Sequence, residues 1–336
     1  MKTFVLSNGD IQLGDWEFRT DLQSTILVYM ITHRCNFKCS YCCGGNTGVL
    51  GDSLVDKHGI QKVIDAFVFL QEQSKRKLFI EFTGGEPFLV DGWIDLVMRL
   101  SERISLGIET NLSTDDIAEF IRKVNPEKIG LLNATYHFVI LDKNPVLQQK
   151  YFLNSEMLVD AGFAPACKII AVPWELSPVI KFEDRLTKLH EKLPQGCIIY
   201  VSLFIGTWNG KQYPFAYTEE QRKFLDKIIT VRKTEQLDYI RGAGSFKGML
   251  CDAGRGALYL SREGELYRCW ADQKGKSLGN LMQGNIRLLD SPTPCLYEEC
   301  GCVLRGLWQG FESWKYFEGG VPSEYNRFYA NEIMSK

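Results

Sequence analysis

The segment from Thr25 to Cys42, TILVYMITHRCNFKCSYC, joins an apolar run directly to a loop that carries three cysteines. The run Thr25–Ile31 is short, rich in Ile, Leu and Val, and bounded by polar residues, which is typical of a buried parallel strand. Five further runs along the chain have the same character. These runs are Leu78–Phe82, Ser105–Glu109, Lys128–Thr135, Ala166–Val172 and Ile198–Ile205.

Segments with helical periodicity separate these runs. Ile60, Val63, Ile64 and Phe67 fall at positions i, i+3, i+4 and i+7, so they share one face of a predicted helix. Proline near the first turn and a threonine N-cap predict further helix starts. These helices are Pro145–Ala161, Pro178–Leu193 and Glu219–Ile229, the last one capped by Thr218.

Six successive β–α pairs predict an α/β fold with a parallel sheet. We favour an open, TIM-like partial barrel with six βα units. A doubly wound sheet would give the same periodicity, so it stays open as the alternative at this point.

The composition is that of an ordinary globular protein. The chain has 336 residues, of which 45% are hydrophobic and 24% charged, and its formal net charge is -2. This balance argues against a nucleic-acid-binding or membrane-surface protein. No apolar run approaches the roughly 20 residues of a membrane helix, and the first ten residues lack the pattern of a secretory signal. We therefore expect a cytoplasmic protein.

Eleven cysteines are many for such a chain, and most of them are clustered. Four lie between Cys35 and Cys43 and five between Cys251 and Cys302, while Cys167 and Cys197 stand apart. Disulfides are disfavoured in a reducing compartment. The two groups therefore predict metal ligands or catalytic thiols.

The first group has the spacing Cys35-x3-Cys39-x2-Cys42. Three thiolates on one loop can bind three irons of a [4Fe–4S] cluster and leave the fourth iron open to a substrate or cofactor. A zinc site, with His33 as fourth ligand, and buried structural thiols are the alternatives. We do not expect Cys43 to be a ligand, because a ligand next to Cys42 would be strained.

This cysteine spacing after the first strand resembles the signature of the radical S-adenosylmethionine (SAM) superfamily. Thr83-Gly84-Gly85-Glu86-Pro87, at the end of the second predicted strand, is similar to the GGE motif of that superfamily. The resemblance covers roughly residues 25 to 230. It implies SAM bound to the open iron, with its amino group held by the GGE segment, since glycine permits close approach of the backbone and Glu86 can accept from an ammonium. By the same resemblance Tyr41 would lie against the adenine and Phe37 near the cluster.

The ends of three later strands fit the same plan. Glu109-Thr110-Asn111 and Asn133-Ala134-Thr135-Tyr136-His137 resemble the turns after the third and fourth strands of the family. The resemblance implies that Thr135 contacts SAM and that Thr110, Asn111, His137 and Lys168 face the barrel mouth, where catalytic residues gather. We assign substrate contacts to Thr110, Asn111 and Lys168, and catalytic roles to His137 and Cys167. Cys167 could return a hydrogen atom to a substrate radical, although buried cysteine is more often packing.

The second cysteine group resembles the SPASM or shorter twitch extension of radical SAM enzymes. Cys251-x12-Gly264-x4-Cys269 is followed by Cys295, Cys300 and Cys302. A full SPASM pattern has seven cysteines, so five imply one auxiliary [4Fe–4S] cluster and a spare, for which Cys295 is the first choice. A four-thiolate zinc site is the alternative. The runs Ala257–Ser261 and Glu265–Cys269 predict a hairpin with a glycine turn.

We expect four parts along the chain: an N-terminal extension (1–24), the partial barrel (25–240), an auxiliary-cluster domain (241–302) and an aromatic tail (303–336). The tail contains Trp308, Phe311, Trp314, Tyr316 and Phe317, which would pack on the barrel or cover the substrate.

The resemblance implies reductive cleavage of SAM to a 5′-deoxyadenosyl radical, with a reductant such as flavodoxin or ferredoxin. We expect hydrogen abstraction from a small polar substrate, such as a sugar, aminocyclitol or nucleotide derivative, followed by oxidation or epimerisation. A peptide maturase of the same superfamily is the first alternative, and a non-catalytic structural metal protein is the second. No nucleic acid or membrane partner is expected.

Overall fold

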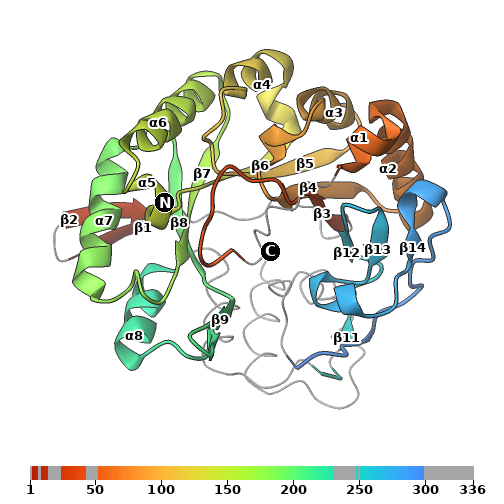
Figure 1. Cartoon of the computed structure of the whole chain (residues 1–336). Helices are drawn as coiled ribbons and strands as arrows, with labels where there is room; N and C mark the ends of the chain where they lie inside the picture. The colour runs from red at the N-terminus through yellow and green to blue at the C-terminus, as the bar shows by residue number, and fades with distance from the viewer. Residues whose placement is uncertain are drawn as a thin grey trace, which may run out of the picture.

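The computed structural model describes residues 24–42, 52–229, 247–248 and 250–298, and the backbone of two N-terminal strands. Six parallel strands form its centre (Figure 1). Each corresponds to one of the apolar runs. They are β3 (Thr25–Thr32), β4 (Leu78–Gly84), β5 (Ser105–Thr110), β6 (Ile129–Thr135), β7 (Pro165–Ala171) and β8 (Ile198–Leu203).

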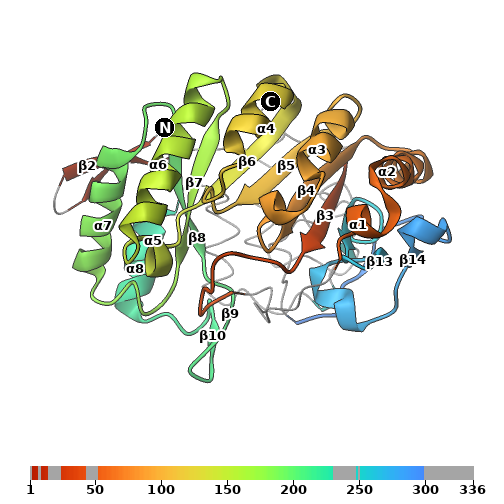
Figure 2. The same cartoon turned by 45° about the horizontal axis from the view of Figure 1, so that its top comes forward.

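The order of these strands settles the architecture. They lie in the sheet as β8-β7-β6-β5-β4-β3, so each strand pairs in parallel with its neighbour in the chain. A doubly wound sheet would reverse direction at a switch point, and this order has no reversal. The partial barrel is therefore confirmed and the doubly wound alternative is wrong. Figure 2 shows the helices on the outer side of the curved sheet.

Helices follow the strands and begin at local capping signals. Thr218 accepts from the backbone of Gln221 in a capping box, as predicted, and Asn144 caps the helix that starts at Pro145. The helices are α1 (Leu54–His58), α2 (Ile60–Ser74), α3 (Trp93–Ser101), α4 (Ile117–Lys123), α5 (Phe138–Leu141), α6 (Pro145–Asp160), α7 (Val179–Lys192) and α8 (Glu219–Ile228), with 3-10 turns at Pro87–Leu89, Pro126–Lys128, Trp270–Lys274 and Leu281–Gln283.

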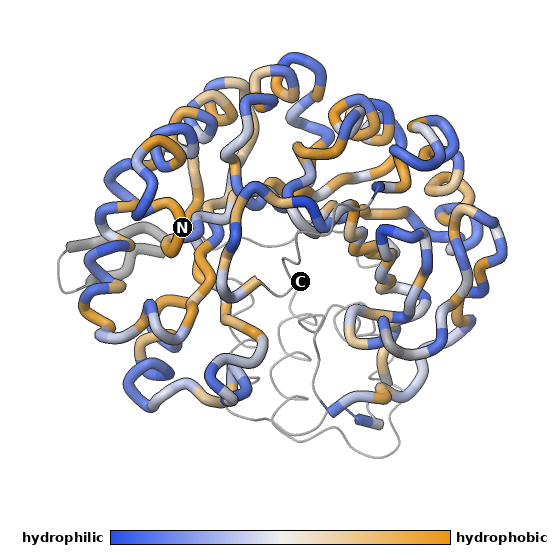
Figure 3. The backbone as a smooth tube through the Cα atoms, viewed as in Figure 1, coloured by the Kyte–Doolittle hydropathy of each residue, from blue (hydrophilic) through white to orange (hydrophobic). Residues whose placement is uncertain are grey.

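The two faces of the sheet bury different residues. The outer face packs against the helices in one large apolar core, to which α2 contributes Val63, Ile64 and Phe67. On the inner face Ile26, Phe79 and Leu131 form a small separate cluster. Figure 3 shows the hydrophobic strands inside the ring of mixed helices. The alternation of side chains along each strand thus separates a helix-facing core from the inside of the barrel.

Both edges of the barrel sheet are extended. At one edge β12 (Ala257–Leu260) pairs in parallel with β3, and β13 (Glu265–Tyr267) and β14 (Gly279–Asn280) follow it. At the other, the hairpin of β1 (Lys2–Leu6) and β2 (Gly9–Leu13) lies next to β8. The hairpin predicted near Gly264 is confirmed, but its strands continue the barrel sheet, because β3 offers an open edge to pair with.

Two short strand pairs complete the described part. They are the hairpin of β9 (Gly206–Trp208) and β10 (Lys211–Tyr213), and the pair of β11 (Leu250–Cys251) with β15 (Thr293–Pro294). None of the described helices is long and apolar enough to cross a membrane. Several predictions fall outside the described residues: those for Cys43, Cys300, Cys302 and the aromatic tail.

Candidate functional site: a cysteine loop at the mouth of the barrel

The three cysteines of the first group lie on the loop that follows β3. The loop closes on itself through hydrogen bonds from the Cys42 amide to the Cys39 carbonyl (3.2 Å) and from the Phe37 amide to the Cys35 sulfur (3.4 Å). Cys35 and Cys39 are partly buried and Cys42 is exposed. Since the carboxyl ends of all six strands meet at this edge of the sheet, the loop lies where a barrel enzyme carries its active site.

Burial and mutual proximity raise the pKa values of these thiols. Burial is the larger cause for Cys35, with contributions from Glu86 and Cys42. Burial and the neighbouring Cys35 and Cys42 raise the pKa of Cys39 to about 12. Bringing three potential thiolates together is unfavourable unless a cation binds them, and a coordinating metal deprotonates a thiol. The trio therefore fits an iron–sulfur cluster that takes one thiolate per iron.

The described residues hold no group of three or more His, Cys, Asp or Glu side chains gathered around one ion position. A cluster differs from a single zinc ion in this respect, because each of its cysteines binds a separate iron.

The GGE segment approaches the cysteine loop closely. The amides of Gly85 and Glu86 donate to the carbonyls of Thr32 and Arg34, each at 2.7 Å. A Cβ atom on Gly85 would lie 1.8 Å from the Arg34 carbonyl oxygen, and one on Gly84 would lie 2.3 Å from the Thr32 oxygen. In this structure the glycines are therefore required by backbone packing of β4 against the loop. This packing role differs from the predicted approach of the backbone to a ligand.

The carboxylate of Glu86 is fully buried. It accepts hydrogen bonds from the Asn111 amide (2.7 Å), the Thr110 hydroxyl (2.8 Å) and the Phe88 amide (3.3 Å). Burial raises the pKa of Glu86 to about 7, while these three donors act in the opposite direction. The carboxylate thus connects the ends of β4 and β5, and this arrangement does not support the predicted direct contact between its side chain and an ammonium.

Thr110 and Asn111 also turn toward the cysteine loop. The Asn111 side-chain nitrogen lies 2.9 Å from the Asn36 oxygen and 3.8 Å from the Cys35 sulfur. The Asn36 amide donates to Ser113 at 2.6 Å. The polar atoms of Thr110 and Asn111 thus hold the loop and Glu86, and their contact with a substrate stays a prediction.

His137 lies against the same loop. Its Nδ1 atom is 2.7 Å from the Tyr41 hydroxyl and 3.5 Å from the Cys39 sulfur, and its ring packs edge-on against Phe37. Burial lowers the pKa of His137 to about 4, so the ring is neutral near pH 7. It was predicted as a catalytic residue open to the substrate, but its contacts are those of a residue that positions Tyr41 and Cys39.

An aromatic wall extends from Tyr41 to the β9–β10 hairpin. Trp174 lies 6.0 Å from Tyr41 and stacks on Trp208 with ring centroids 3.8 Å apart. Phe204 closes the group at 6.1 Å from Trp174. The segment after β8 therefore forms a hairpin whose Trp208 packs on Trp174.

Charged and polar side chains line the inner face of the barrel. Lys168 on β7 donates to both carboxylate oxygens of Glu109 on β5, at 3.2 and 3.1 Å. Asn133 on β6 lies opposite Glu109 in the strand register and donates to it at 2.5 Å. Lys168 was predicted as a substrate residue, whereas Glu109 and Asn133 were missed. The alternation of β5 could have identified Glu109, because it must face away from its neighbours Ile108 and Thr110.

Cys167 lies on the opposite face of β7 from Lys168. Its side chain is fully buried in the core between the sheet and the helices, and it forms a hydrogen bond with Tyr151 of α6. A thiol on that face cannot reach a substrate inside the barrel. The predicted catalytic role of Cys167 is therefore corrected to packing. Thr135 is buried at the end of β6, and its contact with SAM stays a prediction.

The second cysteine group gathers at the edge of the sheet. Cys251 ends β11, which pairs with β15, and Cys295 follows β15 directly. Both Cys269 and Cys295 act on the Tyr297 hydroxyl, whose pKa is raised to about 12, mainly by its hydrogen bond to Asp272. Cys269 and Cys295 thus lie near Tyr297, and Cys251 lies on the strand that pairs with β15. Which of the five cysteines is the spare one stays a prediction.

The buried side chain of Arg268 connects the backbone segments around the second cysteine group. Its side chain is 9% exposed and donates to the carbonyls of Ala253 (2.9 Å), Thr293 (2.8 Å) and Pro294 (3.0 Å). The neighbouring Asp252 is fully buried and forms an ion pair with Arg76, which precedes β4. These contacts attach the cysteine group to the barrel.

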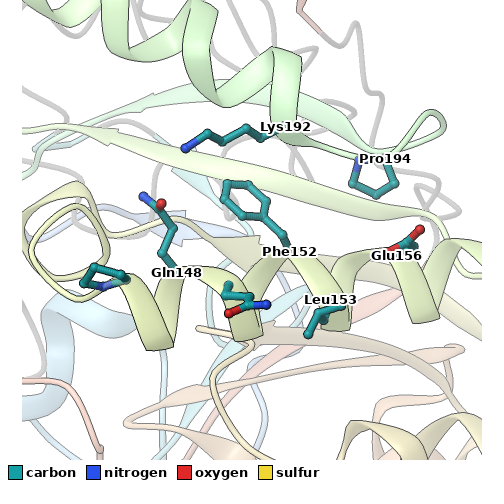
Figure 4. A pocket seen from close by; sticks show the side chains of 8 residues that line it. Gln148, Phe152, Leu153, Glu156, Lys192 and Pro194 are labelled. Atoms are coloured by element: carbon teal, nitrogen blue, oxygen red, sulfur yellow. The ribbon is translucent and has the colours of Figure 1, made fainter.

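A pocket of about 360 Å³ lies on the outer surface, lined mainly by α6. Figure 4 shows Gln148, Phe152 and Leu153 on this helix, with Lys192 of α7 opposite. None of the predicted site residues lines it, so this pocket is separate from the cysteine loop.

An open (β/α)6 barrel with a three-cysteine loop braced by a GGE segment defines a cluster-binding barrel enzyme. Residues 29–172 match the model of the Radical SAM superfamily. The barrel of this chain therefore carries a radical SAM domain, and enzymes with such a domain use a [4Fe–4S] cluster and SAM.

Two curated relatives share a short region with the chain. A GTP 3',8-cyclase of Rhizobium leguminosarum bv. trifolii is 34% identical over 93 residues, which are 27% of this chain and 25% of the relative. GTP 3',8-cyclase 2 of Pseudomonas aeruginosa is 34% identical over 91 residues, or 26% of each protein. The matched region thus spans about a quarter of these relatives.

Two solved structures share the fold over a larger part of the chain. Native anSMEcpe with bound AdoMet has a TM-score of 0.54 at 15% identity, over 77% of this chain and 78% of that one. SuiB of Streptococcus suis bound to S-adenosylmethionine has a TM-score of 0.53 at 12% identity, over 77% and 64%. At such identities the likeness concerns the fold.

Proposed function

We propose that this protein cleaves SAM reductively and uses the resulting radical to take a hydrogen atom from a small polar molecule in the barrel. The observation that carries the proposal is the loop with Cys35, Cys39 and Cys42, braced by the GGE segment and the β5 turn. When bound, a [4Fe–4S] cluster and SAM supply the electron transfer and the 5′-deoxyadenosyl radical.

The residues of the chain position and protect this chemistry. Cys35, Cys39 and Cys42 would hold three irons. Glu86 and Asn111 fix the loop, so that the ligands keep one geometry when the substrate changes. The neutral ring of His137 orients Tyr41, which would lie beside the adenine.

The inner face of the barrel supports a small polar molecule as the substrate. Glu109, Asn133 and Lys168 form a polar layer above the apolar cluster of Ile26, Phe79 and Leu131. A small polar molecule fits such a layer, because its hydrogen-bonding groups find partners that an apolar substrate would leave unpaired.

The second cysteine group is the basis for an electron acceptor in this proposal. We propose that Cys251, Cys269 and Cys295 belong to an auxiliary [4Fe–4S] site of the twitch or SPASM kind. Such a site could accept the electron that a substrate radical gives up, which would make the overall reaction an oxidation. An epimerisation would instead need a hydrogen-atom donor, and Cys167 is too far inside the helix-facing core for that task.

A peptide maturase is the second candidate. The fold shared with SuiB supports it, since one structure of SuiB contains its precursor peptide SuiA. A reductant such as flavodoxin or ferredoxin is proposed for both candidates.

The test is anaerobic reconstitution, followed by measurement of iron, sulfide and deoxyadenosine release from SAM with dithionite. About eight irons per chain with deoxyadenosine formed is the expected result, because two cubane clusters hold four irons each. Bound zinc without deoxyadenosine would overturn the proposal. About four irons with deoxyadenosine would remove the auxiliary site and the oxidation that depends on it.

A further inference from the structure

We propose that Glu109, Asn133 and Lys168 form a binding subsite for a polyhydroxylated molecule that is uncharged or carries an amino group. This inference rests on the proposed function, since it names the substrate class of the same barrel. The three residues come from the adjacent strands β5, β6 and β7 and contact one another inside the sheet.

The subsite has a closed floor. Phe79 packs so closely over Gly107 that a Cβ atom on this glycine would lie 2.9 Å from the phenylalanine ring and 3.3 Å from Leu131. Glu109 and Asn133 are each two residues further along the same strands, so they lie on the same face directly above this floor. A ligand can therefore approach the layer only from the end of the barrel where the cysteine loop lies.

Among the described residues, the side-chain oxygen of Asn133 has no hydrogen-bond partner, and a bound ligand could provide one. The residue is 4% exposed, and its side-chain oxygen has no hydrogen-bond partner within the described part of the chain. A buried acceptor without a partner is unfavourable, and native proteins satisfy nearly all of them. Its side-chain nitrogen already donates to Glu109. An O–H or N–H donor of a bound molecule would therefore supply the missing partner of the oxygen.

Lys168 offers the complementary group. An ammonium has three donors, and the two carboxylate oxygens of Glu109 take two of them. The side chain remains 22% exposed, so a third N–H is available to an acceptor. A hydroxyl group both donates and accepts, and two hydroxyls, or a hydroxyl and an amine, on neighbouring carbons would satisfy Asn133 and Lys168 together.

The charge of the layer selects against anions. The carboxylate of Glu109 neutralises the ammonium of Lys168 within 3.1 Å. The ammonium of Lys168 is thus already paired, and burying a phosphate or carboxylate group without a free cation beside it is costly.

The experiment uses the reconstituted protein with SAM and without reductant, so that probes bind and do not react. Binding of glucosamine, glucose and glucose 6-phosphate is measured by calorimetry and by ligand-observed NMR. We expect glucosamine and glucose to bind at least tenfold more tightly than glucose 6-phosphate. Asn133→Leu, which keeps the side-chain volume, should weaken glucosamine binding about tenfold, the loss expected for one buried hydrogen bond.

Two further variants test the charge argument. Glu109→Gln leaves Lys168 unneutralised and should reverse the order of the probes in favour of glucose 6-phosphate. The double variant Glu109→Gln with Lys168→Met keeps the layer neutral if the single one folds poorly, and it should weaken all three probes. Glu102→Gln and Lys128→Met, both exposed, are the matched controls and should bind like the unmodified protein.

The inference fails if glucose 6-phosphate binds the unmodified protein most tightly, if none of the probes binds, or if Asn133→Leu and the double variant bind like the controls. Deoxyadenosine release by the unmodified protein with dithionite separates this failure from failure of the proposed function. Release without sugar binding overturns the subsite alone, and absence of release overturns the radical chemistry itself.

Discussion

The two cysteine groups are held in different ways. The loop of Cys35, Cys39 and Cys42 lies at the barrel mouth and is fixed by side chains from other strands, above all Glu86 and Asn111. The group of Cys251, Cys269 and Cys295 lies at the sheet edge between strands of two to four residues, clamped by one arginine. We therefore expect the first loop to keep its fold without a cluster, and the second group to depend on a bound metal for its order.

Removing the cysteines of the loop should give the largest effect. Cys35→Ala, Cys39→Ala and Cys42→Ala together should abolish deoxyadenosine release while about four irons per chain remain, because the second group is separate in space. Iron analysis and product chromatography measure this. Cys197→Ala, a half-buried thiol outside both groups, is the control. Retained SAM cleavage in the triple variant would remove the loop from the mechanism.

Removing ligands of the second group should affect the fold. Cys251→Ala with Cys269→Ala should lower the melting temperature of the reconstituted protein by roughly 10 °C, because metal binding contributes directly to folding at such sites. Calorimetry compares it with the triple variant, which should melt within a few degrees of the unmodified protein. Equal melting temperatures for the two variants would contradict the prediction that the second group depends more on bound metal for its folding stability.

Adding a methyl group to Gly85, which follows β4, should displace the cysteine loop that packs against it. Gly85→Ala places a Cβ atom 1.8 Å from a backbone oxygen of the loop, so the backbone must move. We expect a loss of about 2 to 4 kcal/mol in unfolding free energy and little SAM cleavage. Gly210→Ala has free space but a positive φ, and should cost only about 1 kcal/mol. Denaturant titration measures both.

The buried carboxyl of Glu86 should make stability depend on pH. Burial raises its folded pKa to about 7 from 4.5, so this group contributes stability that is complete below pH 4.5 and is lost as the pH rises toward 7. The loss should be on the order of 2 to 3 kcal/mol. Glu86→Gln should remove this part of the slope, and exposed Glu102→Gln should retain it. A slope unchanged in Glu86→Gln would assign the effect elsewhere.

Replacing Arg268, which connects the backbone segments around the second cysteine group, should have the smallest effect. Arg268→Met keeps most of the packing volume but leaves three carbonyls without their donor. We expect a loss of about 1 to 3 kcal/mol and lower iron content at the second group, with SAM cleavage retained. Exposed Arg103→Met serves as the control. A loss of SAM cleavage equal to that of Gly85→Ala would mean that the two groups are not independent.

Much of the fold could be read from short-range patterns. Strand positions follow from apolar runs that must be buried on both faces, and helix starts follow from caps such as Thr218. The cysteine loop and the GGE segment are likewise local motifs. The contacts of Thr110, Asn111, His137 and Cys167 could not be predicted, because a strand end offers a side chain to either face and the sequence does not state the register.

Periodicity and spacing along the chain are enough to predict the six βα units, the two cysteine groups and the GGE segment. The order of the strands, the contact of Glu86 with the loop and the meeting of Glu109, Asn133 and Lys168 inside the barrel become visible in the folded molecule alone. Such contacts join residues 24 to 59 positions apart. They form only when neighbouring strands pair in one register, and no local pattern encodes that register.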